Sequence, residues 1–398
     1  MQPIKINPRG EQPAAKFALF ELGFRPFFLC AAASAVAYMG LWLAVYVWGL
    51  SLKLPYSAAV WHQHEMLFGY TVAVIAGFLL TAVQNWTGRS TPKGVPLALL
   101  VGVWLVGRIA PWLAFPPWLA ALSDVVFLPL LAIVLAAPIL RRKQWHNCLI
   151  PAMLLGMALA NVGVHAAALG LKAPQVDGHQ LMLGLVVALI IVLAGRLIPF
   201  FTRRAYGGVE PPQHKVLGGI LHGAVAGFIL TKALFPETWL LGVFSLLAAG
   251  ALGWRLLGWY AASIWSEPLL WALHVGCAWI VVGFGLQALV SAGLLAVPLA
   301  VHAFTAGGIG VVTLGMMVRV SLGHTSRPMR ASKPMTFAFI LINAAAFSRV
   351  ILPLLIPNQY VNVMVFFGGL WMAAFGLFVW KFTPILIGLR KNTEGLPG

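Results

Sequence analysis

Long apolar stretches recur along the whole chain, and short segments with charged residues, Gly or Pro separate them. A helix that crosses a bilayer needs about 20 mostly apolar residues. Twelve stretches meet this requirement, at residues 27–50, 62–85, 95–114, 118–140, 147–169, 179–201, 214–235, 238–258, 270–293, 298–320, 335–356 and 360–382. They are continuous, unlike the alternating segments of about ten residues that form outer-membrane barrels. The pattern predicts an all-α, polytopic membrane protein with about 12 transmembrane helices.

Composition and charge placement narrow the class further. Of the 398 residues, 61% are hydrophobic and only 9% are charged, which excludes an ordinary soluble domain. A net charge of +17 would suggest nucleic acid as a partner of a soluble protein, but here Lys and Arg gather in alternate loops. The opposite loops contain only Lys53, Lys172 and Lys232. By the positive-inside rule we expect cytoplasmic N- and C-termini, an inner-membrane location and no nucleic-acid partner.

An internal repeat becomes visible when His64, His179 and His302 are superposed without gaps. The positions that then coincide are Gly69, Gly184 and Gly307; Thr87, Thr202 and Thr325; and Arg89, Arg204 and Arg327. Four spans separate each copy from the next, so the copies enter the membrane in the same orientation and an axis along the membrane normal would relate them.

The predicted organisation is therefore a single membrane domain, residues 1–398, built from three parallel four-helix repeats. The proposed units are residues 27–140 (spans 1–4), 141–258 (spans 5–8) and 259–382 (spans 9–12), with a cytoplasmic or interfacial segment 1–26 and a cytoplasmic tail 383–398. A threefold arrangement would bring the three histidines to one depth at the outer face, where converging imidazoles can bind a metal. Taken singly, the repeated residues also have ordinary roles, since Gly permits close helix packing and Arg and His occur at membrane interfaces.

Ionisable side chains inside a membrane are costly, so each is a candidate functional residue. The polar residues predicted in the outer third are His62, His64, Glu65, Arg108, Asp124, Asn161, His165, His179, His302 and Arg349. Asn161 and His165 are four residues apart and share a helix face, the spacing by which an amide can orient a ligand imidazole. His62 and His64 are two apart and point in different directions, so both would bind one metal only if the helix began at His64.

The residue types favour haem b and copper as cofactors. Imidazoles suit copper and haem iron, whereas surroundings poor in carboxylates and free of thiolates disfavour magnesium, calcium and iron–sulfur clusters. Arg108 and Arg349 need anionic partners, which are either haem propionates or, for one of them, Asp124. Near the cytoplasmic side, His222 and His274 are candidates to ligate a second haem if their spans are adjacent.

Several strings of the sequence resemble the NnrS family, and together they cover the chain nearly end to end. They are FELGFRPFF at 20–28, WHQHEMLFGYTVAVIAGFLLTAVQNWTGR at 61–89, NVGVHAA at 161–167, GRLIPFFTRR at 195–204 and VRVSLGHTSR at 318–327. The residues at the matching positions are His62, His64, Glu65, Asn161, His165, Arg196, His302, Arg319 and His324. Ser326 stands where Gly is commoner, in a loop.

The resemblance implies a haem- and copper-containing bacterial inner-membrane protein that is associated with denitrification and relieves nitrosative stress. Its expected partners are nitric oxide, the lipid membrane and a quinol or another electron donor. Arg196 and Arg319 join the cofactor-binding candidates, and Glu65 and Asp124 are the outer-side carboxylates that would relay protons as catalytic groups.

Several functions remain open at this point. Nitric oxide is either reduced to N₂O by a metal-dependent, nitric oxide reductase-like oxidoreductase or only bound. A non-catalytic haem/copper or NO-binding sensor is one alternative. A secondary transporter is another, because parallel repeats and intramembrane charges also occur in transporters.

Overall fold

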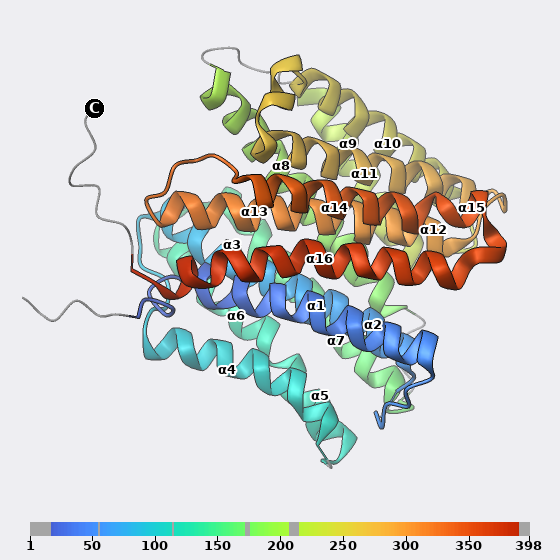
Figure 1. Cartoon of the computed structure of the whole chain (residues 1–398), viewed down its shortest axis with the longest axis horizontal. Coiled ribbons are helices and arrows are strands. Elements are labelled where there is room, and N and C mark those ends of the chain that lie inside the picture. Colours follow the sequence, from blue (N-terminus) through green and yellow to red (C-terminus); the bar gives the residue numbers. More distant parts are fainter. Residues whose placement is uncertain (1–16, 55, 114, 172–175, 207–214, 390–398) are drawn as a thin grey trace, which may run out of the picture.

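The computed structural model describes residues 17–54, 56–113, 115–171, 176–206 and 215–389, and all regular structure in these ranges is helical (Figure 1). Twelve helices or runs of consecutive helices are long and apolar enough to cross a membrane, which confirms the predicted multi-pass, all-α fold. In chain order they are α1 (Phe24–Trp48); α2 (Ala58–His64) with η1 (Glu65–Thr71) and α3 (Val72–Thr87); α4 (Val95–Ile109) with η2 (Ala110–Trp112); α5 (Pro117–Val125) with α6 (Phe127–Arg141); η3 (Trp145–Asn147) with α7 (Leu149–Ala168); α8 (Gly178–Tyr206); α9 (Lys215–Leu234); α10 (Trp239–Trp259); α11 (Pro268–Ser291); α12 (Val297–His302) with η5 (Ala303–Ile309) and α13 (Gly310–His324); α14 (Lys333–Val350) with α15 (Leu352–Leu355); and η6 (Pro357–Gln359) with α16 (Tyr360–Ile387).

Local sequence explains several helix ends. Ser57 precedes α2 and accepts a hydrogen bond from the backbone N–H of Val60 at 3.3 Å, which caps the helix. α1 and α3 end at Gly49 and Gly88, whose φ angles of 69° and 64° lie in the left-handed region that glycine adopts without a Cβ clash.

The first and last spans lie side by side, so the bundle closes on itself. α16 packs along α1 and also along α14, and Figure 1 shows these three helices running together across the molecule. α4 and α5 lie at one edge of the bundle, and α9 and α10 lie at the opposite edge (Figure 1). The run Ala58–Thr87 is the most enclosed span, with 89% of its apolar window buried, and it is the span that carries His62, His64 and Glu65.

The three helices that carry the repeated histidines meet at the centre. α8 contacts both η1 and η5, and α3 contacts α13. η1 and η5 are π-helical turns, and each begins directly after a repeated histidine, His64 or His302, whereas α8 continues as an α-helix. Such wide turns inside α-helices are often found at functional sites.

The repeated threonines also behave alike in all three copies. The hydroxyls of Thr87, Thr202 and Thr325 donate to the carbonyl four residues earlier, at 2.7, 2.9 and 2.6 Å. Thr81 and Thr305 make the same kind of bond at other positions, so these bonds do not distinguish the repeated residues, and the internal repeat stays a prediction. The limits of the three units, and the side of the membrane on which the termini lie, stay predictions.

Candidate functional site

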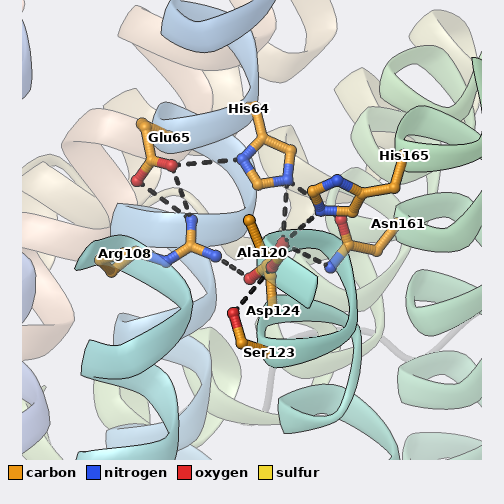
Figure 2. Close-up of polar contacts among 8 residues, drawn as sticks. All are labelled: His64, Glu65, Arg108, Ala120, Ser123, Asp124, Asn161 and His165. Carbon is orange, nitrogen blue, oxygen red and sulfur yellow. Dashed lines mark hydrogen bonds and ion pairs between the residues drawn. The ribbon is translucent and has the colours of Figure 1, made fainter. Parts of the chain in front are cut away.

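Six polar side chains meet inside the bundle and form the outer polar cluster. Its members are His64, Glu65, Arg108, Asp124, Asn161 and His165, contributed by α2, η1, α4, α5 and α7 (Figure 2). Every member is buried, with at most 6% of its surface exposed. Buried polar groups of this kind are stable only when they satisfy one another.

Asp124 lies at the centre of the outer polar cluster. Its Oδ1 pairs with Nη2 of Arg108, and its Oδ2 faces Nε2 of His165 at 2.9 Å and Nε2 of His64 at 3.1 Å (Figure 2). Asn161 donates through Nδ2 to the same Oδ2 at 2.9 Å, and its Oδ1 lies 3.0 Å from Nε2 of His64. One carboxylate oxygen therefore holds the guanidinium, and the other holds both imidazoles.

Glu65 completes the cluster on the opposite side of Arg108. Nη1 of Arg108 donates to both Glu65 oxygens at 3.0 Å, and Glu65 Oε1 lies 3.3 Å from Nδ1 of His64. With both carboxylates ionised and both imidazoles neutral, the cluster carries a formal charge of −1. Both nitrogens of His64 face acceptor oxygens, so the cluster can accommodate one further proton or cation.

The arrangement is suited to a metal ion. One ligand atom each from His64, Asp124 and His165 can be chosen so that all lie within 4.8 Å of one another. In a tetrahedral site with bonds of about 2.0–2.1 Å, neighbouring ligand atoms lie about 3.4 Å apart. The observed N–O separations of 2.9 and 3.1 Å are a few tenths shorter, so a small outward movement would admit an ion. Two imidazoles and a carboxylate suit copper, zinc or iron.

Two glycines that the sequence analysis did not assign to the site allow these side chains to approach. A Cβ on Gly107 would lie 2.9 Å from Cα of Asp124, so only glycine lets α4 come this close to α5. A Cβ on Gly69 would lie 2.8 Å from Oε2 of Glu65. Gly69 was visible as a repeated residue and Gly107 as the neighbour of Arg108, but only packing shows what each of them accommodates.

A second site lies next to the outer polar cluster and is called here the histidine cavity. It has a volume of about 340 Å³ and is lined by His62, His179, His302 and Arg349, with Trp42 and Tyr360 among its aromatic walls. The rings of His62 and Trp42 stack with centroids 4.5 Å apart. His302 donates through Nδ1 to the carbonyl of Pro298 at 2.7 Å, which leaves its Nε2 available.

Several nitrogens of the histidine cavity have no protein partner within the described ranges. They are Nδ1 of His62, Nε2 of His179 and Nε of Arg349, all buried. Arg349 donates to the hydroxyl of Tyr360 at 3.0 Å, and no carboxylate of the described residues pairs with its guanidinium. In the part of the chain that the structure describes, Arg349 is thus a buried cation without a counter-ion, and it lies beside several unpaired imidazole nitrogens. This combination indicates a site for an anionic ligand that imidazole nitrogens can also coordinate.

The two sites are neighbours because α2 contributes to both. His62 and His64 lie on one regular helix that begins at Ala58, so His62 lines the histidine cavity while His64 belongs to the outer polar cluster. His62 and His64 were expected to bind one metal only if the helix began at His64, and it does not. The rings of His64 and His179 lie 6.5 Å apart, centroid to centroid. The three imidazoles that line one cavity are accordingly His62, His179 and His302, in place of the expected set that included His64.

Of the remaining arginine candidates, Arg108 belongs to the outer polar cluster, and Arg196 and Arg319 lie elsewhere. Arg108 is paired with Asp124 and Glu65, which corresponds to the ion-pair alternative and removes the need for a haem propionate there. Arg196 is exposed and donates to Oδ1 of Asn147 at 2.7 Å. Arg319 lies 3.5 Å from the centroid of a phenyl ring, that of Phe201.

The structure does not bring His222 and His274 to a common site. His222 is exposed on α9, and its Nδ1 is 2.6 Å from the carbonyl of Gly218. His274 is buried on α11, where its nitrogens face the carbonyls of Leu270 and Trp259. α10 packs against both α9 and α11, and no hydrogen bond or ring contact joins the two imidazoles in the described part of the chain. A second haem between them therefore finds no support in the packing.

Comparison with known proteins agrees with this arrangement of motifs. No curated protein matches the chain. The model of one protein family, described as "NnrS protein", matches residues 18–390, nearly the whole length. The match includes every span and both of the sites described above, and the chain therefore belongs to the NnrS family.

Proposed function

We propose that this chain is a haem- and copper-containing protein of the bacterial inner membrane that binds nitric oxide and helps to remove it. This role would protect the cell against nitrosative stress and would be associated with denitrification. The observation that carries the proposal is the adjacency of two unlike sites. A cavity with three histidines and an uncompensated arginine lies directly beside a buried cluster of two histidines and two carboxylates.

The residues of the histidine cavity fit a haem. Its volume of about 340 Å³ lies within the usual range of cofactor pockets, and its walls are largely aromatic and aliphatic. Imidazole nitrogens of His62, His179 and His302 would be the candidate ligands of the haem iron, and Arg349 would be the candidate partner of a propionate. When bound, the haem would supply an iron that binds nitric oxide and accepts electrons from a quinol or another donor.

The outer polar cluster fits copper better than haem. It offers two imidazoles and one carboxylate within bonding reach of a single ion but no open space for a porphyrin. Asn161 would hold the imidazole of His64 in place, as amides commonly do around metal ligands. Arg108, which pairs with both carboxylates, would hold them in position.

The carboxylates of the cluster are suited to move protons. Reductive coupling of two NO molecules to N₂O and H₂O consumes two electrons and two protons. Glu65 and Asp124 both contact His64, at 3.3 and 3.1 Å, and the ring of His64 lies 6.5 Å from that of His179 in the histidine cavity. These contacts support a role for Glu65 and Asp124 in passing protons through His64 toward that cavity.

Two other functions compete with this proposal. A non-catalytic NO or metal sensor would need the same two sites but no proton supply. A secondary transporter would be expected to place its site where helices are broken near the midplane. Here the seven-residue π-helical segments η1 and η5 adjoin histidines instead.

The test is the reduced-minus-oxidised absorption spectrum of the purified full chain, with and without NO, together with haem and copper analysis. A b-type spectrum that shifts with NO, and is lost in His62→Ala, His179→Ala or His302→Ala, supports the proposal. His222→Ala serves as a matched control and should retain the spectrum. A featureless spectrum from protein produced with ample haem and copper would refute the proposal and favour transport. N₂O release by reduced protein separates turnover from binding alone.

A further inference from the structure

A second, smaller cavity lies where the three repeated helices meet, and it is called here the axial cavity. It has a volume of about 70 Å³, and α3, α8 and α13 line it together with α11. Residues at matching positions of the three copies surround it. Two such sets are Val74, Leu189 and Val312, and Ile75, Ile190 and Thr313, which coincide when the three repeated histidines are superposed.

The axial cavity has too few polar partners to hold a water molecule. Its lining is hydrocarbon except for the hydroxyls of Thr71 and Thr313, the thiol of Cys277 and the thioether of Met316. Thr71 donates its hydroxyl to the carbonyl of Met66 at 2.7 Å, and Thr313 donates to that of Ile309 at 2.6 Å. A buried water needs two to four polar partners, whereas apolar cavities stay dry and take up small apolar molecules such as xenon.

The size of the axial cavity limits what it can hold. A volume of about 70 Å³ exceeds the 10–15 Å³ or so that one water-sized probe needs, but it is smaller than the roughly 150 Å³ cavity known to bind benzene. A porphyrin, a quinone ring or a lipid chain is too large. The occupant is therefore a small, uncharged molecule, of the size of a diatomic gas.

The axial cavity adjoins the histidine cavity. Thr71, the last residue of η1, lines both of them. Tyr70 of the histidine cavity and Thr313 of the axial cavity are joined by a hydrogen bond between their hydroxyls. Because the hydroxyl proton of Thr313 is directed to the Ile309 carbonyl, Tyr70 is the donor in this bond, which ties η1 to α13 between the two cavities.

The lining is also incompletely sealed from the surroundings of the bundle. Phe78, Leu193 and Leu197 line the axial cavity and are half-buried rather than buried. An uncharged gas dissolves in the hydrocarbon part of a bilayer, so a partly open apolar cavity at this depth can fill from the membrane without a polar channel.

We infer that the axial cavity is a holding site for a small uncharged gas molecule, which passes from it between Thr71 and the Tyr70–Thr313 bond into the histidine cavity. Occupancy by such a gas follows from the volume and lining alone. The identification of the gas with nitric oxide, and of the histidine cavity as its destination, rests on the proposed function.

Xenon tests occupancy without any cofactor, and Cys277 supplies a native reporter. The infrared S–H stretching band of a buried thiol shifts when its surroundings change, and a Cys277→Ala variant identifies its band among the three cysteines. Xenon equilibrated with the full chain in detergent should shift the Cys277 band and leave those of Cys30 and Cys148 unchanged. Ala194→Phe, which fills the axial cavity, should abolish the shift, whereas Ala188→Phe on the same helix, outside the lining, should retain it.

The supply route is tested by the rate at which NO reaches the metal-loaded protein. Ala194→Phe should slow NO association several-fold and Tyr70→Phe should accelerate it, while the spectrum of the NO-bound state stays unchanged. No xenon shift at Cys277, or the same shift in Ala194→Phe, would overturn the holding site. A xenon shift with unaltered NO rates would overturn the route alone. Protein without haem would refute the proposed function and would leave the xenon result standing.

Discussion

Removal of the Arg108 guanidinium is the most direct test of the outer polar cluster. Arg108→Met keeps much of the side-chain volume but leaves Glu65 and Asp124 as two buried carboxylates without a cation. Arg108 donates to both oxygens of Glu65 at 3.0 Å and pairs with Asp124, and only about 5% of its side chain is exposed. Breaking a buried pair by removal of one partner costs about 3–5 kcal/mol. We expect the free energy of unfolding to fall by about this amount.

Arg349→Met is the matched control because Arg349 is equally buried but, among the described residues, donates to a hydroxyl alone. Its guanidinium donates to Tyr360 at 3.0 Å and pairs with no carboxylate of the described residues. Loss of one hydrogen bond costs about 0.5–1.5 kcal/mol, and removal of an uncompensated buried charge offsets this cost. In protein free of haem we therefore expect Arg349→Met to change stability by less than about 1 kcal/mol.

The assay is reversible unfolding of the purified protein in mixed detergent micelles, followed by tryptophan fluorescence at neutral pH. A combined variant with Arg108→Met, Glu65→Gln and Asp124→Asn removes all three charges and should recover most of the lost stability, since neutral replacement of a buried ion pair is often tolerated. Equal stability of Arg108→Met and the unaltered protein would refute the proposed pairing. So would a larger loss in Arg349→Met than in Arg108→Met.

Three further outcomes follow from the same geometry. Gly107→Ala should destabilise the protein by about 1–3 kcal/mol in the same unfolding assay, because the new Cβ would lie 2.9 Å from the α5 backbone. Gly102→Ala on the same helix is the control. Its new Cβ meets nothing within 4 Å, and the variant should be slightly more stable than the unaltered protein. His165→Ala should lower copper content without loss of haem, whereas His302→Ala should lower haem content without loss of copper; metal analysis that finds both cofactors lost together in each variant would contradict two separate sites. Arg349→Met should weaken haem retention about 10-fold, the equivalent of one charged hydrogen bond, and an unchanged haem off-rate measured by transfer to apomyoglobin would exclude a propionate at this arginine.

Most members of the outer polar cluster could be predicted from the sequence, because a charged or polar side chain within an apolar span indicates a functional residue without any structural information. Asp124, Glu65, His64, Asn161 and His165 were identified by their presence in apolar spans, and the structure brings all five together. Arg108 was identified too, but its partner was left open between a propionate and Asp124. Whether Arg108 pairs with Asp124 depends on how closely α4 approaches α5. Gly107 permits the close approach, but the hydropathy of the sequence does not show it.

The sequence by itself determined the twelve spans, the all-α fold and the family. The bilayer imposes a minimum apolar length on each helix and requires every backbone hydrogen bond to be satisfied within it, so length and hydropathy suffice. Only the tertiary structure decided how the polar residues divide between two sites. Residues two apart on a helix face different neighbours, and the identity of those neighbours depends on helix packing across the bundle. For this reason His62 lines the histidine cavity and His64 contacts Asn161 and Asp124, although both stand in one short motif.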